Sequence, residues 1–138
     1  MATKKILVID DDRLFLAFLE RSISAAYPDL QLTTCADPFA GLKKISADLD
    51  LLLLDLEMPG LDGKKLLDYA KATGLKRSNI IILSGREADD LHQLFPMGEC
   101  LAVLNKHEAR QKAVLDMILQ ALQGKARTGD ENGVPGCP

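Results

Sequence analysis

The sequence is poor in the residues that build disulfide frameworks, zinc sites and aromatic platforms. Its 138 residues include no tryptophan, 4% aromatic residues, two histidines and three cysteines. The cysteines, Cys35, Cys100 and Cys137, lie far apart and form no CxxC pair. Neither a disulfide framework nor a zinc site of ordinary spacing is therefore expected, and a reducing, cytoplasmic setting fits this cysteine usage.

Long apolar runs and an excess of basic charge are also missing. No stretch approaches the roughly 18 consecutive apolar residues of a membrane span, and the N-terminus MATKKILVIDDD has too short an apolar segment for a signal peptide. The 17 basic and 20 acidic residues give a net charge of −3. Nucleic-acid binders usually show a basic excess, so we expect no direct nucleic acid partner and no membrane partner.

Apolar segments that the sequence does contain are short and evenly spread. Four of them are apolar without alternation, which is typical of strands covered on both faces. They are residues 6–9, 51–54, 80–83 and 101–104. A weaker run at 30–35 alternates more and predicts a strand near a sheet edge.

Between these runs the apolar period changes to that of a helix. Two apolar stripes are expected, one of Leu14, Phe15, Phe18, Leu19 and Ile23, the other of Val114, Leu115, Ile118, Leu119 and Leu122. Asp37-Pro38 predicts the start of a short helix through Lys44. Asp62-Gly63 precedes a helix to Ala72 that Gly74 would end. A further short helix is predicted at 88–95.

This order alternates strand and helix five times, which predicts an α/β protein with a doubly wound, five-stranded parallel sheet. The chain has room for one domain, which we place at residues 1–124. Residues 125–138 are rich in glycine and proline and predict a disordered tail or a linker.

Polar residues follow the predicted strands. Asp10, Asp11 and Asp12 come after the first run, Asp55 after 51–54, Ser84 after 80–83, and Lys106 just after 101–104. Parallel strands place their carboxyl ends at one edge of a sheet, where ligands bind in doubly wound folds. Carboxylates, a hydroxyl and an ammonium group are therefore expected in one pocket.

This set of side chains suits a hard divalent cation and phosphoryl transfer. Oxygen ligands favour Mg²⁺ or Mn²⁺, which would relieve the repulsion among the carboxylates. A metal, a lysine, a hydroxyl and a carboxylate nucleophile are equipped to form an acyl phosphate. The sequence has no GxxxxGK[ST] and no GxGxxG segment, so the phosphoryl group is expected from another molecule rather than from a bound nucleotide.

With these residues the chain resembles the receiver domain of two-component response regulators. The matching pieces are ILVIDDD at 6–12, LLLLDLEMPGLDG at 51–63, IIILSG at 80–85 and LNK at 104–106. They occur in the family's order and spacing over residues 4–123. The resemblance implies the flavodoxin-like (βα)5 fold with strand order 2-1-3-4-5.

The resemblance also implies a role for each matching residue. Asp55 would be the phosphoacceptor, and Asp10 and Asp11 the acidic pair that binds Mg²⁺ together with Asp55. Glu57 would contribute its backbone carbonyl to the metal. Ser84 and Lys106 would contact the phosphoryl group.

Partners follow from the same resemblance. A sensor histidine kinase or a histidine phosphotransfer protein would supply the phosphoryl group in a phosphorelay, a downstream protein would read it, and a homodimer on phosphorylation is a further state that the family admits. The chain would then be a signalling domain that catalyses only its own phosphorylation and dephosphorylation. Two alternatives stay open: an Asp-nucleophile phosphohydrolase, and a pseudo-receiver that binds partners without accepting phosphate.

Several neighbouring residues are interpreted as structural. Asp12 fits the N-cap of the first helix better than a metal ligand. Met58-Pro59-Gly60 is expected to form the turn after Asp55. The sequence departs from the family pattern at Val103, where an aromatic residue is usual, and at His107, where proline is usual. Val103 is too small and stiff to act as an aromatic switch.

Overall fold

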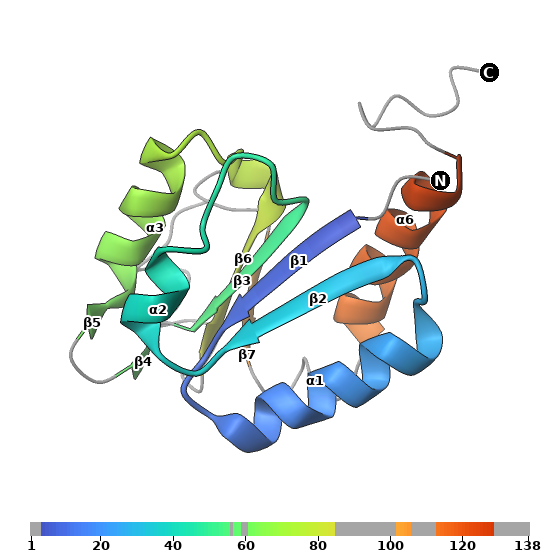
Figure 1. The fold of residues 1–138 in the computed structure, drawn as a ribbon, viewed down its shortest axis with the longest axis horizontal. Coiled ribbons are helices and arrows are strands. Elements are labelled where there is room, and N and C mark those ends of the chain that lie inside the picture. Colours follow the sequence, from blue (N-terminus) through green and yellow to red (C-terminus); the bar gives the residue numbers. More distant parts are fainter. Residues whose placement is uncertain (1–3, 56, 59–60, 85–101, 106–112, 129–138) are drawn as a thin grey trace.

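The computed structural model describes residues 4–55, 57–58, 61–84, 102–105 and 113–128. Its centre is a five-stranded parallel sheet in the order β2-β1-β3-β6-β7 (Figure 1). The strands are β1 (Lys4–Ile9), β2 (Leu30–Cys35), β3 (Leu51–Asp55), β6 (Ile80–Ser84) and β7 (Ala102–Asn105). Since β4 and β5 form a separate small pair, this order is the predicted 2-1-3-4-5 arrangement, and the predicted fold class is confirmed.

Strand burial follows the apolar pattern of the sequence. Every residue of β3 is at most 1% exposed, because helices cover the central strand on both faces. Strand β2 lies at the edge of the sheet and keeps exposed and half-buried residues along its length. Three of the continuous runs therefore became the central strands β1, β3 and β6, and the alternating run became the edge strand β2. The fourth continuous run, at 101–104, became β7 at the other edge.

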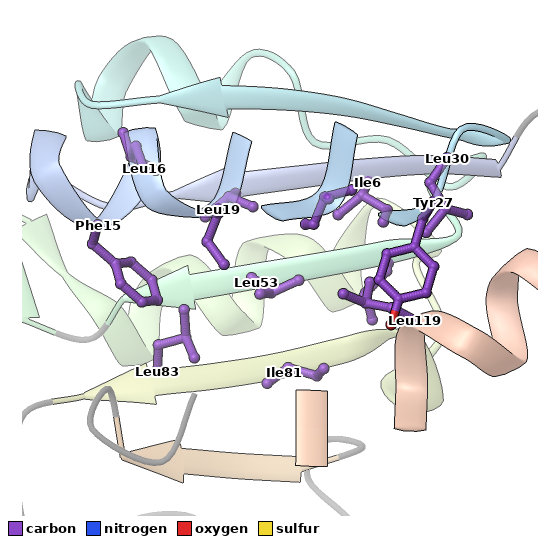
Figure 2. Close-up of a cluster of buried hydrophobic side chains, with 13 residues drawn as sticks. Ile6, Phe15, Leu16, Leu19, Tyr27, Leu30, Leu53, Ile81, Leu83 and Leu119 are labelled. Atoms are coloured by element: carbon purple, nitrogen blue, oxygen red, sulfur yellow. The ribbon is translucent and has the colours of Figure 1, made fainter. Parts of the chain in front are cut away.

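Helices of the described ranges cover both faces of the sheet (Figure 1). Helices α1 (Arg13–Ala26) and α6 (Ala113–Thr128) lie on one face, and α2 (Pro38–Leu42) and α3 (Gly63–Ala72) on the other. Figure 2 shows the first core, in which side chains of α1 and Leu119 of α6 meet residues of β1, β3 and β6 on the face of the sheet that these two helices cover. The second core contains the alternate residues of the same strands, such as Leu7, Leu52 and Ile80.

A polar clamp joins α6 to the turn between α1 and β2. The Asp29 N–H donates to Gln123 Oε1 at 3.2 Å, and Gln123 Nε2 donates back to the Asp29 carboxylate. The Tyr27 hydroxyl donates to Asp116 Oδ1 at 3.1 Å. Burial of Tyr27 and its bond to Asp116 raise the pKa of that phenol. The clamp lets Gln123 be buried with its amide satisfied.

Helix ends are set by the residues that the sequence suggested. The Asp12 carboxylate accepts the N–H groups of Leu14 and Phe15 at 3.1 and 3.2 Å, so Asp12 is the N-cap of α1. Asp37 caps α2 in the same way, with Pro38 at the first position. Gly74 has a φ of 99°, which is the left-handed conformation that ends α3. These caps confirm the predicted helix starts and the predicted stop.

Three details differ from the sequence interpretation. Leu14 was expected in the buried stripe of α1 but is 81% exposed, because the stripe runs through Leu16 and Leu19 and leaves Leu14 on its flank in the first turn. Helix α2 ends at Leu42, with Lys43 rather than Lys44 at its end. Helix α6 continues past residue 124, the expected domain boundary, to Thr128.

The helix predicted at 88–95 and residues 129–138 of the expected tail lie outside the described residues. Among the helices of the described ranges, none has both the length and the apolar character needed to cross a membrane.

Candidate functional site

Three carboxylates meet at the carboxyl edge of the sheet. Asp10 directly follows β1, and Asp55 is the last residue of β3. The register pairs Ile9 with Leu54. Asp10 and Asp55, the residues that follow this pair, therefore lie next to each other on neighbouring strands. One carboxylate oxygen from each of Asp10, Asp11 and Asp55 lies within 4.8 Å of the other two. We call these three residues the acidic cluster.

Burial divides the acidic cluster into an inner and an outer part. Asp10 and Asp55 are 0% and 1% exposed, whereas Asp11 is exposed. Buried carboxylates are rare in proteins unless other groups compensate for the lost hydration. The exposed Asp11 keeps the cluster open to ions from solvent.

The backbone holds Asp10 in place from two directions. Its N–H donates to the carbonyl of Cys35, the last residue of β2, at 3.1 Å. Its Oδ1 accepts the N–H of Asp12 at 2.9 Å. Asp12 was predicted only as a helix cap, and this second role was not predicted. An aspartate that accepts the N–H two residues on is a common turn, and the DDD run contained that signal.

A small hairpin begins two residues after Asp55. Strand β4 (Glu57–Met58) pairs antiparallel with β5 (Leu61–Asp62), with Met58 opposite Leu61. Met58 is 5% exposed and packs in the second core. The chain thus turns back between Met58 and Leu61, as predicted for the Met58-Pro59-Gly60 segment, although Pro59 and Gly60 lie outside the described residues.

The backbone also brings the end of β6 to this edge. Leu83 pairs with Asp55, so Ser84 is the next residue along the neighbouring strand, and Ser84 in turn pairs with Asn105. Lys106 and His107 lie outside the described residues, and for Glu57, Ser84 and Val103 the structure describes the backbone but not the side chain. Of the predicted site, the structure therefore brings together the acidic cluster and the strand end that carries Ser84.

Such a cluster favours a cation. Three carboxylates within reach of one another repel, and a hard divalent ion with oxygen ligands is the partner that removes this repulsion most directly. Within the described ranges this donor set contains no thiolate or imidazole, which argues against a soft metal.

Comparison with protein families gives one match that covers most of the chain. Residues 6–119 match the model of the response regulator receiver domain. The matched range includes all of the acidic cluster, the strands β2, β3, β6 and β7, and β1 from Ile6 onward.

Individual proteins agree with the family match. The chain is 28% identical over 132 residues to a protein-glutamate methylesterase/protein-glutamine glutaminase of Nitrobacter winogradskyi, covering 89% of this chain and 30% of that protein. It is 34% identical over 85 residues to the response regulator MprA of Mycobacterium ulcerans, covering 61% of this chain and 35% of that protein. The chain therefore spans about a third of the length of these relatives.

A solved structure shows the same fold. The receiver domain of the Francisella response regulator 1452 superimposes with a TM-score of 0.72 at 22% identity, covering 89% of this chain and 98% of that one.

Proposed function

Because the chain belongs to the response regulator receiver family, we propose that it accepts a phosphoryl group on Asp55 and signals through that modification. The observation that carries the proposal is the acidic cluster, in which a buried strand-end carboxylate lies within 4.8 Å of two others. A structural role alone would not require three like charges to converge at the ligand-binding edge of the sheet.

In the proposed step, an oxygen of Asp55 attacks the phosphorus of an activated donor. The Asp55 O–P bond forms while the bond from phosphorus to the donor nitrogen or oxygen breaks, and the electron pair leaves with the donor. Asp55 attacks as the carboxylate and so needs no base to remove a proton. We assign to Ser84 and Lys106 the contacts to the phosphoryl oxygens, which the family pattern implies.

Mg²⁺ is the metal that fits this donor set, and Mn²⁺ is the nearest alternative. Asp10, Asp11 and Asp55 would hold it with the Glu57 backbone carbonyl. When bound, it supplies positive charge that offsets the charge of the carboxylates and of the arriving phosphoryl group. The contacts from Cys35 and Asp12 keep Asp10 oriented for this role.

We propose a histidine kinase or a histidine phosphotransfer protein as the donor and a separate protein as the reader of the phosphorylated form. The matched relatives are about three times as long as the aligned region, so their further activities are not transferred to this chain. The chain itself is proposed to act only on its own phosphorylation state, in the cytoplasm.

Incubation with Mg²⁺ and a small phosphodonor tests this function. We expect a mass increase of one phosphoryl group, sensitive to hydroxylamine because an acyl phosphate is formed, and its loss in Asp55→Asn. Asp48→Asn, which removes an exposed aspartate from the opposite edge of the sheet, is the matched control and should be labelled like the parent. Rapid release of many equivalents of phosphate without accumulation of the labelled chain would support the hydrolase instead, and absence of both label and phosphate release in the parent would support the pseudo-receiver.

A further inference from the structure

Helix α2 lies close against the sheet at Gly41. Gly41 is buried, and a Cβ atom placed on it would lie 2.9 Å from three side-chain atoms of Ile9, namely Cγ1, Cγ2 and Cδ1. Carbon atoms in proteins do not approach so closely without a shift. The absence of a side chain at residue 41 is thus what lets α2 rest on β1.

Ile9 has little freedom to yield to a larger neighbour. It is 0% exposed, it is β-branched, and its strand is hydrogen-bonded between β2 and β3. Helix propensity alone would favour alanine at residue 41. The contact with Ile9 favours glycine instead. This contact outweighs the helix propensity, because both Gly41 and Ile9 are buried and neither can move into solvent.

Any adjustment at this contact reaches Asp10 by one of two routes. If Ile9 moves, Asp10 moves with it as the next residue. If α2 moves instead, it displaces Asp37, whose carbonyl accepts the N–H of Gly41 at 2.9 Å and the thiol of Cys35 at 3.3 Å. The carbonyl of Cys35 is the acceptor of the Asp10 N–H. Both routes end at the acidic cluster.

We propose that Gly41 is a positioning residue of the acidic cluster: its lack of a side chain fixes the place of Ile9 and Cys35 and thereby the orientation of the Asp10 carboxylate. The consequence for metal binding rests on the function proposed above. The consequence for the geometry of Asp10 does not, and it can be measured in the metal-free protein.

The test compares Gly41→Ala with the parent by titration of Mg²⁺, followed through the backbone amide signals of residues 10, 11 and 55. We expect the variant to stay folded, with its Asp10 amide signal shifted before any metal is added and its affinity for Mg²⁺ about tenfold weaker, as is typical when a group that orients a metal ligand is disturbed. Gly124→Ala is the matched control, since a Cβ at Gly124 meets no atom within 4 Å. It should leave both readings unchanged.

A second pair of variants isolates the contact with Ile9. Ile9→Ala removes all three atoms that the new Cβ would meet, so adding Gly41→Ala to that background should change Mg²⁺ affinity by no more than about twofold. If Ile9→Ala does not fold, Ile9→Val replaces it. Ile9→Val removes only Cδ1, so adding it to Gly41→Ala should restore part of the Mg²⁺ affinity that Gly41→Ala alone has lost. Parent-like affinity and amide signals in folded Gly41→Ala would overturn the proposal, as would an undiminished effect in the Ile9→Ala background.

These readings keep the two proposals separate. A parent chain that binds no Mg²⁺ contradicts the proposed function. The metal-free shift of the Asp10 amide in Gly41→Ala, against none in Gly124→Ala, still decides whether Gly41 positions that residue.

Discussion

The two edges of the sheet differ in how their charged side chains are arranged. At the amino edge, lysines of β1 face aspartates that precede β3: Lys4 Nζ lies 3.8 Å from Asp50 Oδ1, and Lys5 Nζ lies 3.0 Å from Asp48 Oδ2. Asp50 also accepts the N–H of Lys5 at 2.8 Å. At the carboxyl edge, three carboxylates come together instead.

This difference separates a structural use of charge from a functional one. Opposite charges at the amino edge let β1 begin with Lys4, which is 5% exposed although lysine is seldom buried. Like charges at the carboxyl edge oppose folding and are useful only if a ligand compensates for them. The amino edge should therefore respond to mutation in stability, and the carboxyl edge in ligand binding.

The largest expected effect is at the carboxyl edge. Asp11→Ala removes one of few carboxylate ligands, so we expect Mg²⁺ affinity to fall about tenfold or more, measured by calorimetric titration. The free energy of unfolding of the metal-free protein should not decrease. Parent-like affinity would show that Asp11 is not a ligand.

A smaller effect is expected from the buried lysine of the amino edge. Lys4→Met keeps the apolar stem but removes the charge beside Asp50, which we expect to lower the free energy of unfolding by about 1 kcal/mol in urea. The cost is modest because the Asp50 side chain is 31% exposed and keeps its bond from Lys5. Mg²⁺ affinity should stay at the parent value; a weakened affinity would contradict the separation of the two edges.

Relief of repulsion in the acidic cluster should be smaller still. Asp11→Asn keeps the shape of the side chain and removes its charge, so the metal-free protein should gain less than about 1 kcal/mol of stability. Added salt should shrink the gain, because mobile ions screen an exposed charge. A salt-independent gain would point to a packing effect rather than to charge.

The smallest effect concerns protonation at the amino edge. The hydroxyl of Ser46, and then Lys5, hold the pKa of Asp48 below its usual value. Such a group adds stability above its unfolded pKa, and the contribution is lost as pH falls through the lower folded pKa. Ser46→Ala should raise the pKa of Asp48 in a carbon NMR titration without a measurable change in unfolding at neutral pH. An unchanged pKa would leave Lys5 as the main cause.

Much of the fold was predictable because the determining signals are local. Apolar runs marked β1, β3 and β6, and Asp12 and Gly74 marked helix ends. The acidic cluster was predictable for a related reason. Once strands are parallel, residues that directly follow them share an edge, so Asp10 and Asp55 could be paired from their positions alone.

Features that depend on contacts between distant segments were not predictable. Strand β1 was expected to begin at Ile6, because nothing near Lys4 in the sequence indicates that Asp50 would compensate for its charge. The exposure of Leu14 was not predicted. Neighbouring residues of a helix point about 100° apart around its axis, and a stripe of five apolar residues does not define the buried direction well enough to place Leu14 outside it. The contact of Gly41 with Ile9 has no local signal at all.

The clamp between α6 and the turn after α1 has a consequence for the order in which the chain folds. Asp29 and Gln123 are 94 residues apart in sequence, and Leu119 completes the first core. Among the described residues, all members of the second core lie between Leu7 and Ile82. During synthesis from the N-terminus, the second core, under α2 and α3, can therefore form first. The first core, under α1, is complete only after α6 has been made. The contact between Asp29 and Gln123 closes a loop of 94 residues, so the docking of α6 is a late step. Until α6 docks, Phe15 and Leu19, which are buried in the folded chain, stay accessible to chaperones.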